Sequence, residues 1–318
     1  MSAMRLSTRE WLSAHGHVHE DFDAGDLATR LTERVSVVIP ARNEAATVGE
    51  VVAGLRRELV ERVPLVGELV VIDSDSTDAT AAIAADAGAT VHRSADIAPH
   101  LGTHPGKGEA LWKSLFVTSG ELLVFVDADL TEWGPHFVTG LVGALTADPG
   151  TVLVKGWYDR VMDVPGSAPS TEGGRVTELV ARPVLDLWWP ELAGVVQPLA
   201  GEWAARRSFM ETLTVPTGYG VEIASLLDAL RGHGLDGIAQ VDLGARAHRH
   251  QRDHDLAVMA AELLAVVHAR YDGEPVPVTV AADELEQYTR EGGWRTRRVP
   301  LAQRPPAIDQ PGYPGGTR

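Results

Sequence analysis

The stretch that decides the fold is Glu121–Asp129, which reads Glu-Leu-Leu-Val-Phe-Val-Asp-Ala-Asp. Its apolar run is typical of a strand that is buried on both faces, as in a parallel sheet covered by helices. The run ends in two carboxylates, Asp127 and Asp129. Open α/β sheets bind ligands at the carboxyl ends of their strands. Paired carboxylates there suit Mg²⁺ or Mn²⁺ bridging nucleotide phosphates, although they also fit a turn or a helix start.

Segments of the same kind recur on both sides of this stretch. From Val35 to Tyr158, short β-branched runs alternate with amphipathic patterns and Gly or Pro punctuation. This alternation predicts an α/β fold, in which helices flank a mainly parallel sheet. We expect strands at Val35–Pro40, Glu68–Asp73, Ala89–His92, Glu121–Val126, Thr151–Lys155 and Gly237–Leu243, and helices at Ala45–Leu59, Ser76–Ala87, Lys107–Thr118, Arg175–Val184, Gly220–Leu230 and Leu256–Tyr271.

Composition narrows the class of protein. The chain has 318 residues, of which 44% are hydrophobic and 23% charged, as in ordinary globular proteins. Its net charge of −16 argues against nucleic acid as the main partner. The absence of cysteine excludes disulfides and cysteine metal sites, and it is compatible with a cytoplasmic location. We find no apolar run long enough to span a bilayer and therefore expect no membrane partner.

Changes in composition divide the chain into four regions. Residues 1–30 form a polar N-terminal extension without the apolar core of a signal sequence, and residues 31–160 form a nucleotide-binding α/β region. Residues 161–255 supply the second wall of the active site. Residues 256–318 contain a helix and a tail, and the Pro- and Gly-rich stretch Arg304–Arg318 is expected to be irregular or disordered.

Four polar loops follow the predicted strands. The carboxyl ends of parallel strands lie at one edge of a sheet, so we expect these loops to meet there. Taken alone, Asn43 and Ser76 fit helix caps, and Lys107 fits a solvated surface lysine. Their convergence at one edge favours a ligand site. The loops are Pro40–Glu44, Asp73–Asp78, Pro105–Gly108 and Asp127–Asp129.

The same loops resemble the motif series of the A-type nucleotide-sugar glycosyltransferases. The Asn-Glu and Asp-X-Asp motifs are generic within that superfamily. The Gly-Gly-Arg-Val-Thr-Glu block at 173–178 and the Gly-Tyr-Gly-Val-Glu block at 218–222 are specific. With them the chain closely resembles the actinobacterial glucosyl-3-phosphoglycerate synthases, over roughly Val35 to Arg249.

This resemblance implies an A-type glycosyltransferase fold, with a Rossmann-like mixed sheet and an acceptor-binding C-terminal half that includes residues 161–255. It implies transfer of glucose from UDP-glucose to the 2-hydroxyl of 3-phosphoglycerate, with retention of configuration and with Mg²⁺ or Mn²⁺. The product begins the synthesis of glucosylglycerate and methylglucose lipopolysaccharide. The family also suggests a homodimer through Leu256–Tyr271 and the aromatic segment near Trp188, although a contact within one chain fits them equally.

The resemblance also assigns site residues. A metal at Asp129 and His248 would neutralise charge on the departing diphosphate, while Asp127 would contact the ribose or a metal-bound water. Glu222 either holds sugar hydroxyls or acts as a base. The catalytic set is Asp127, Asp129, Glu222 and Lys107. The donor set is Pro40, Ala41, Asn43, Glu44, Ser74, Lys107, Asp127, Tyr219 and Glu222. The acceptor set is Gly174, Arg175, Val176, Thr177, His250 and Arg252, where a guanidinium and free amides at a helix start suit a phosphate.

Two departures from the family pattern bear on specificity. Relatives usually follow the His-Arg pair with Asn-Arg, whereas here His250 and Gln251 precede Arg252. Asp75 stands where relatives often have glycine, and an added carboxylate near the nucleotide could change the choice between UDP and GDP sugars.

Three alternative functions are therefore open. The first is a mannosyl-3-phosphoglycerate synthase that uses GDP-mannose, or a donor-promiscuous relative. The second is a polyprenyl-phosphate or polysaccharide glycosyltransferase, which usually brings a membrane anchor. The third is a non-catalytic nucleotide-sugar sensor.

Overall fold

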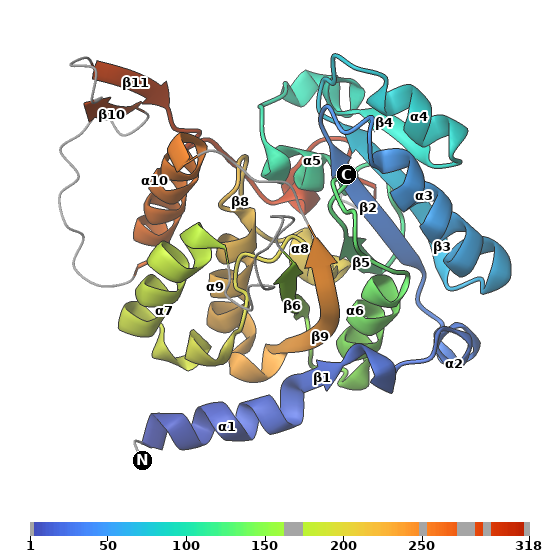
Figure 1. The fold of residues 1–318 in the computed structure, drawn as a ribbon, viewed down its shortest axis with the longest axis horizontal. Helices are drawn as coiled ribbons and strands as arrows, with labels where there is room; N and C mark the ends of the chain where they lie inside the picture. Colours follow the sequence, from blue (N-terminus) through green and yellow to red (C-terminus); the bar gives the residue numbers. More distant parts are fainter. Residues whose placement is uncertain (1–2, 162–173, 248–252, 272–283, 289–293, 315–318) are drawn as a thin grey trace.

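An eight-stranded mixed sheet runs through the protein (Figure 1). The structure is a computed structural model that describes residues 3–161, 174–247, 253–271, 284–288 and 294–314. In spatial order, the strands are β1 (Gly16–Val18), β9 (Ile238–Ala247), β6 (Leu153–Val161), β7 (Trp203–Arg206), β5 (Leu122–Phe125), β2 (Val35–Ala41), β3 (Val66–Asp73) and β4 (Thr90–Arg93).

One strand runs against the others. β7 is antiparallel to both β5 and β6, while the remaining neighbours pair in parallel. The prediction of a mainly parallel sheet is confirmed, and all six predicted strands are present. Their limits differ from the prediction by at most two residues, except that β6 and β9 continue six and four residues further. β7 was not predicted, because four residues are too few to show a period. Its reversal brings the residue before it, Glu202, to the edge where the other strands end.

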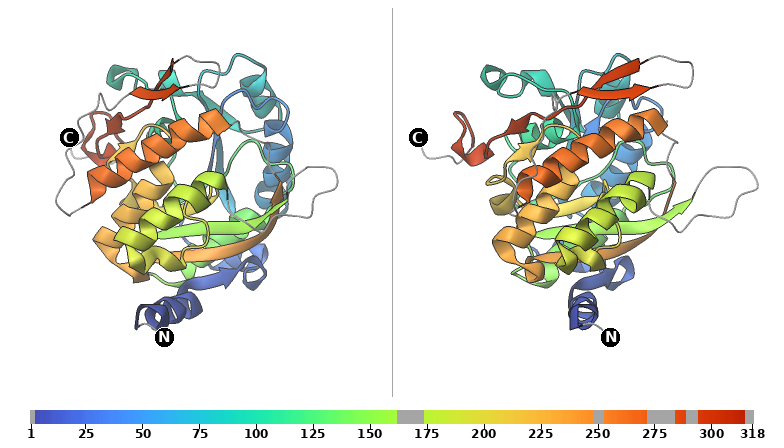
Figure 2. Two further views of the ribbon diagram at one scale, coloured as in Figure 1. Left: turned by 60° about the vertical axis from the view of Figure 1, so that its left-hand side comes forward. Right: turned by 90° about the vertical axis from the view of Figure 1, so that its left-hand side faces the viewer.

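The helices cover the two faces of the sheet (Figures 1 and 2). Alternate residues of β2 point to opposite cores: Val37 and Ile39 pack with α3 and α6, whereas Val38 packs with α5 and α9. α7 and α10 join α5 and α9 on the second face. The helices are α1 (Ala3–His15), α2 (Ala24–Arg30), α3 (Val48–Arg56), α4 (Thr80–Asp86), α5 (Lys107–Ser114), α6 (His136–Ala147), α7 (Arg182–Trp188), α8 (Arg207–Met210), α9 (Val221–His233) and α10 (Asp253–Arg270). Within the described ranges, none is long and apolar enough to cross a bilayer.

Several predicted helix limits need correction. The helix expected at Ala45–Leu59 begins at Val48 and continues as a π-helix over Arg57–Arg62. The helix expected at Ser76–Ala87 begins only at Thr80. Ser76 is not its cap, because its hydroxyl accepts a hydrogen bond from another loop. The expected helix Arg175–Val184 contains a π-helical stretch, Thr177–Ala181, before α7.

The C-terminal stretch was expected to be irregular or disordered. As far as residue 314 it is irregular, but it packs against the rest of the protein instead of being disordered. β12 (Gln303–Arg304) pairs with β8 (Val215–Pro216), and Ala307 and Tyr313 are buried. Arg304 donates to both carboxylate oxygens of Glu109 on α5, at 2.6 and 2.7 Å. Composition could not reveal this order, because it comes from one buried ion pair and from backbone pairing with a distant strand.

We predict that Arg304→Ala destabilises the protein by about 3–5 kcal/mol, because Glu109 would remain buried without its cation. Both side chains of this ion pair are less than 10% exposed. Urea unfolding at pH 7.5 measures the change, with Arg9→Ala at an exposed position as the control. A loss below about 1 kcal/mol, the usual worth of a surface pair, would contradict the prediction.

Candidate active site

Lys107 joins two of the predicted catalytic carboxylates. It is the first residue of α5, and its Nζ lies 2.6 Å from Oδ1 of Asp127 and 2.8 Å from Oε1 of Glu222. Asp127 follows β5 and Glu222 opens α9. The side chains of Lys107 and Glu222 are 13% and 5% exposed. The structure therefore brings together three residues that the sequence assigned to the same site.

A buried arginine from β9, Arg246, completes this cluster. Arg246 was not among the site residues predicted from the sequence. Arg246 Nη2 lies 3.0 Å from Oδ2 of Asp127 and 3.2 Å from Oδ1 of Asp129. Its Nη1 donates to Glu202 at 2.8 Å and to the hydroxyl of Tyr158. Arg246 lies within a buried strand and Glu202 lies just before one. Charged residues are rare at such positions, so both could have been recognised in the sequence as candidate site residues. Their partners could not be read from the sequence.

Opposite charges set the protonation of the Asp-X-Asp pair. Burial would raise the pKa of Asp127, but Lys107 and Arg246 outweigh it and hold that pKa well below its usual range. Burial raises the pKa of Asp129, and the negative charge of Asp127 raises it further. Asp129 is also the more exposed of the two, at 35% against 22%. Asp129 is thus the carboxylate with most to gain from an added cation.

The described part of the cluster holds more acids than bases, which fits a divalent cation. Four carboxylates face two permanent cations, an excess of two negative charges. The carboxylates are those of Asp127, Asp129, Glu202 and Glu222, and the cations are Lys107 and Arg246. The described residues contain no group of three or more His, Cys, Asp and Glu side chains that could hold a metal. The second predicted ligand, His248, lies outside the described residues.

The segment before β7 packs tightly against Asp127. A Cβ added to Gly201 would lie 2.1 Å from Oδ2 of Asp127, so only glycine permits this approach. Behind it, Lys155 donates from Nζ to the carbonyl of Ala200 at 2.8 Å. Burial lowers the pKa of Lys155 to about 7. Lys155 thus supports the backbone beside Asp127 without being a permanent third cation.

The two loops assigned to the nucleotide form one hydrogen-bonded unit. Asn43 has a left-handed backbone (φ 59°) and accepts at Oδ1 from the amide of Thr77 at 2.8 Å. The backbone amide of Asn43 donates to Ser76 Oγ at 3.0 Å. Asn43 therefore holds a loop rather than capping a helix. The other predicted residues of this unit lie on it: Pro40 and Ala41 end β2, Ser74 donates to the carbonyl of Ala41, and Glu44 donates to Thr80 Oγ1.

Asp75 is not a lone carboxylate beside the nucleotide loops. Its backbone is left-handed (φ 57°), a conformation that glycine adopts more readily than other residues. Its Oδ1 pairs with Nε of Arg93 at 2.7 Å, and both side chains are about half exposed. The added charge is therefore matched by an arginine at the end of β4.

The predicted acceptor residues that the structure describes open the helical stretch leading into α7. Gly174 accepts a backbone hydrogen bond from Glu178 at 2.9 Å. Arg175 is exposed, whereas Val176 and Thr177 are 8% and 3% exposed, which leaves little of the threonine hydroxyl accessible. His250 and Arg252 lie outside the described residues. Tyr219, assigned to the donor, is 47% exposed and lies in the electrostatic field of Lys107, Asp127 and Glu222.

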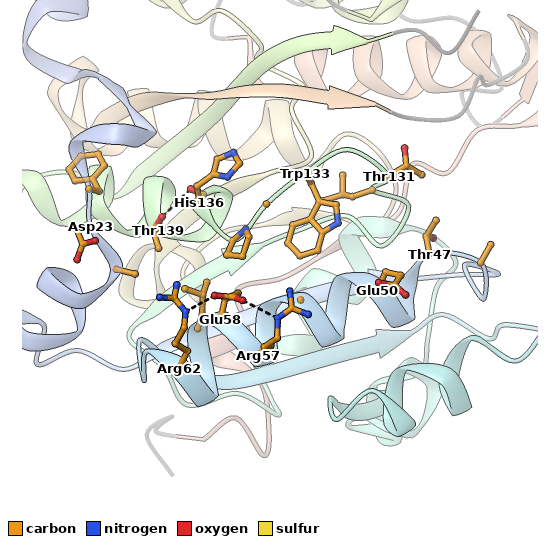
Figure 3. Close-up of a pocket in the computed structure, with 18 residues that line it drawn as sticks. Asp23, Thr47, Glu50, Arg57, Glu58, Arg62, Thr131, Trp133, His136 and Thr139 are labelled. Carbon is orange, nitrogen blue, oxygen red and sulfur yellow. Dashed lines mark hydrogen bonds and ion pairs between the residues drawn. The ribbon is translucent and has the colours of Figure 1, made fainter.

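A separate cavity of about 770 Å³ lies between α2, α3 and the start of α6 (Figure 3). Among the described residues that line it, none was predicted to bind donor, acceptor or metal. Its two arginines, Arg57 and Arg62, both pair with Glu58, at 2.9 and 2.6 Å. The cavity is distinct from the Asp127 cluster.

Comparison with known proteins bears directly on this site. Residues 36–196 match the model of Glycosyl transferase family 2. The glucosyl-3-phosphoglycerate synthase of Petrotoga mobilis is 43% identical, over 93% of this chain and 94% of its own. The enzyme of that name from Mycolicibacterium smegmatis is also 43% identical, over 93% and 96%.

Solved structures agree with these relatives. The crystal structure of glucosyl-3-phosphoglycerate synthase from Mycobacterium tuberculosis with Mn²⁺, UDP and glucosyl-3-phosphoglycerate has a TM-score of 0.79 and 41% identity, over 90% of this chain and 95% of that one. The same enzyme with Mn²⁺, UDP and phosphoglyceric acid has a TM-score of 0.80 and 40% identity. The predicted fold is confirmed. The chain belongs to the glucosyl-3-phosphoglycerate synthases, within family 2 of the glycosyltransferases.

Proposed function

We propose that this chain transfers glucose from UDP-glucose to the 2-hydroxyl of 3-phosphoglycerate, with retention of configuration. The observation that carries the proposal is the cluster at the carboxyl edge of the sheet, where Lys107 and Arg246 hold Asp127 and Asp129, and where Glu202 and Glu222 bring the excess of negative charge. Relatives that share about two fifths of their residues with the chain are named glucosyl-3-phosphoglycerate synthase, and a structure of the Mycobacterium tuberculosis enzyme contains Mn²⁺, UDP and phosphoglyceric acid.

Each group of the cluster has a role in this reaction. A divalent cation, Mn²⁺ or Mg²⁺, held by Asp129 and His248 would stabilise charge on the departing diphosphate. Lys107 adds a buried positive charge on the side of α5. Glu222 is paired with Lys107 at 2.8 Å, which favours holding sugar hydroxyls over acting as a base. The acceptor proton then passes to the departing phosphate, as expected for attack on the face that it leaves.

The acceptor side is assigned to the start of the helical stretch at Gly174–Thr177. Arg175 offers an exposed guanidinium next to backbone amides at a helix start, which suits a phosphate. His250 and Arg252 would complete this clamp. We retain the division in which residues 31–160 bind the donor and residues 161–255 the acceptor. Glu222 and Arg246 belong to the acceptor region by number, but their side chains pair with Lys107 and Asp127 of the donor region.

We predict that Arg175→Ala raises the KM for 3-phosphoglycerate by about tenfold or more, while the KM for UDP-glucose changes by less than about threefold. Loss of the guanidinium would remove the charge-assisted contact proposed for the acceptor phosphate. Initial-rate kinetics with each substrate varied in turn measure both constants. Arg182→Ala, further along the same helical stretch, is the control, and equal effects on both substrates would refute the placement.

One experiment separates the proposed function from its alternatives. The protein is incubated with 3-phosphoglycerate, Mn²⁺ or Mg²⁺, and either UDP-glucose or GDP-mannose, and the glycoside is identified by mass and NMR. Glucosyl-3-phosphoglycerate from UDP-glucose supports the proposal. A mannosyl product from GDP-mannose alone supports the mannosyltransferase, and nucleotide binding without release of UDP or GDP supports the sensor.

We further propose a homodimer that uses an exposed aromatic patch beside α10, together with a cytoplasmic location. The ring centroids of Trp188 and Tyr271 lie 5.4 Å apart, and the two residues are 44% and 40% exposed. Leu264 on α10 is 44% exposed. Apolar side chains gathered at a surface are typical of interfaces. Sedimentation of the wild type and of Leu264→Glu tests this; a wild-type monomer at micromolar concentration would refute the dimer.

A further inference from the structure

The turn Thr217–Gly220 lies between Lys107 and Glu222, two residues of the predicted donor site. It packs against the start of α5, where Gly108 donates to the carbonyl of Gly218 at 2.9 Å and Glu109 donates to the carbonyl of Thr217 at 2.8 Å. Lys107 precedes these donors, and Glu222 follows the turn by two residues. The position of the turn therefore sets the spacing between the Lys107 ammonium and the Glu222 carboxylate.

This contact between the turn and α5 leaves no room for side chains. A Cβ added to Gly106 would lie 2.3 Å from the carbonyl oxygen of Thr217, and one added to Gly108 would lie 1.9 Å from that of Pro216. Gly106 also has a φ of 130°, which favours glycine. A small shift of the turn away from α5 would break both backbone hydrogen bonds.

Glu262 holds the other side of the turn. It extends from α10, is completely buried, and accepts at Oε1 from the amide of Gly220 at 3.1 Å. A Cβ added to Gly218 would lie 2.1 Å from the same oxygen. Oε2 is buried and has no hydrogen-bond partner in the structure. A buried carboxylate with one unpaired oxygen is costly, and the backbone amide of Gly220 in the turn is the partner that offsets this cost.

We propose that Glu262 is a positioning residue, which clamps the Thr217–Gly220 turn against α5 and so fixes Lys107 and Glu222 at the spacing that the donor requires. The role rests on the proposed function, because it assigns these two residues to the nucleotide sugar. Glu262 itself acts through the backbone of the turn. Its effect should therefore fall on the donor and on turnover, and not on the acceptor.

The titration of Glu262 gives a readout that a merely space-filling residue would lack. Burial raises its pKa to about 7, and the charge of Glu222 on α9 adds to this rise. Tyr219 and Gly220 act in the opposite sense through their backbone hydrogen bonds. Between the ordinary pKa of 4.5 and the raised value of about 7, the Glu262 carboxyl is protonated in the folded protein and ionised in the unfolded chain. Stability is therefore lost as the pH rises from about 4.5 to about 7.

The test compares Glu262→Gln and Glu262→Ala with the wild type and with Glu191→Gln, a matched change at an exposed position. Glutamine keeps the oxygen that accepts from Gly220 and removes the buried charge. We expect its donor kcat/KM to stay within about threefold of the wild type, and alanine to lower it by on the order of 10- to 100-fold. The acceptor KM should change by less than about threefold in both variants. The fall in Tm between pH 5 and 7.5 should be smaller in Glu262→Gln than in the wild type and Glu191→Gln.

The outcomes separate this role from the proposed function. If the wild type makes the glycoside and Glu262→Ala has wild-type donor kcat/KM, the positioning role is wrong and the function stands. A loss of donor kcat/KM of about tenfold or more in Glu262→Gln also refutes the role, because glutamine keeps the oxygen that accepts from Gly220. This outcome applies even if the alanine variant does not fold. A wild type that neither turns over nor binds UDP with Mn²⁺ in calorimetry removes both proposals.

Discussion

Replacing Asp129 with alanine should lower glucose transfer by about 10³-fold while the protein remains folded. If Asp129 holds the metal as proposed, its loss removes the main stabilisation of charge on the departing diphosphate, a contribution of several kcal/mol to the barrier. The fold should persist because Arg246 keeps its pairs with Asp127 and Glu202. Removing Asp129 also removes a negative neighbour of Asp127.

The measurement is turnover at saturating Mn²⁺ and again at saturating Mg²⁺, with Mn²⁺ affinity followed separately by electron paramagnetic resonance. Glu132→Ala, an exposed acid three residues further on, is the matched control. We expect the control to bind Mn²⁺ as the wild type does. Near-normal turnover of Asp129→Ala at saturating metal, or unchanged Mn²⁺ affinity, would overturn the assignment.

Replacing Arg246 with methionine should cost about 3–5 kcal/mol of stability, and activity should fall with it. The guanidinium is the shared partner of three acidic side chains, and it is only 6% exposed. Burial already raises the pKa of Glu202. Without the arginine, the carboxylates of Glu202 and Asp127 would have to ionise in a buried place, Asp127 with Lys107 as its remaining cation.

The stability lost in Arg246→Met should increase as the pH rises. Without Arg246, the folded-state pKa values of these acids rise above their unfolded values, so the variant loses stability as the pH rises. Urea unfolding should therefore show a larger deficit at pH 8 than at pH 5. Glu202→Gln in the same chain should recover part of the loss, since it removes one uncompensated charge. An equal deficit at both pH values would contradict this explanation, and Arg9→Met is the exposed control.

Much of the donor half could be predicted because its pattern is local. β-branched runs such as Val35–Ala41 form strands buried on both faces, and polar residues follow directly where they end. Parallel strands then bring those residues to one edge, where Lys107 and Asp127 are found in contact. Glu222, which the family resemblance and not the strand pattern assigned to the site, contacts Lys107 there. The limits of the helices were less accurate, because Asn43 and Ser76 bond to each other's loops instead of capping helices.

The sequence by itself determined the alternation of strands and helices, the Asp-X-Asp edge and the family to which the chain belongs. Only the tertiary structure decided which charges meet: Arg246 with Asp129, 117 residues apart, and Arg304 with Glu109, 195 residues apart. The reversal of β7 brought Glu202 to the site, and the packing of α10 brought Glu262 to the turn before α9. Local patterns record which face of an element is buried. The partner of a buried charge depends on how distant elements pack, and no local pattern records that.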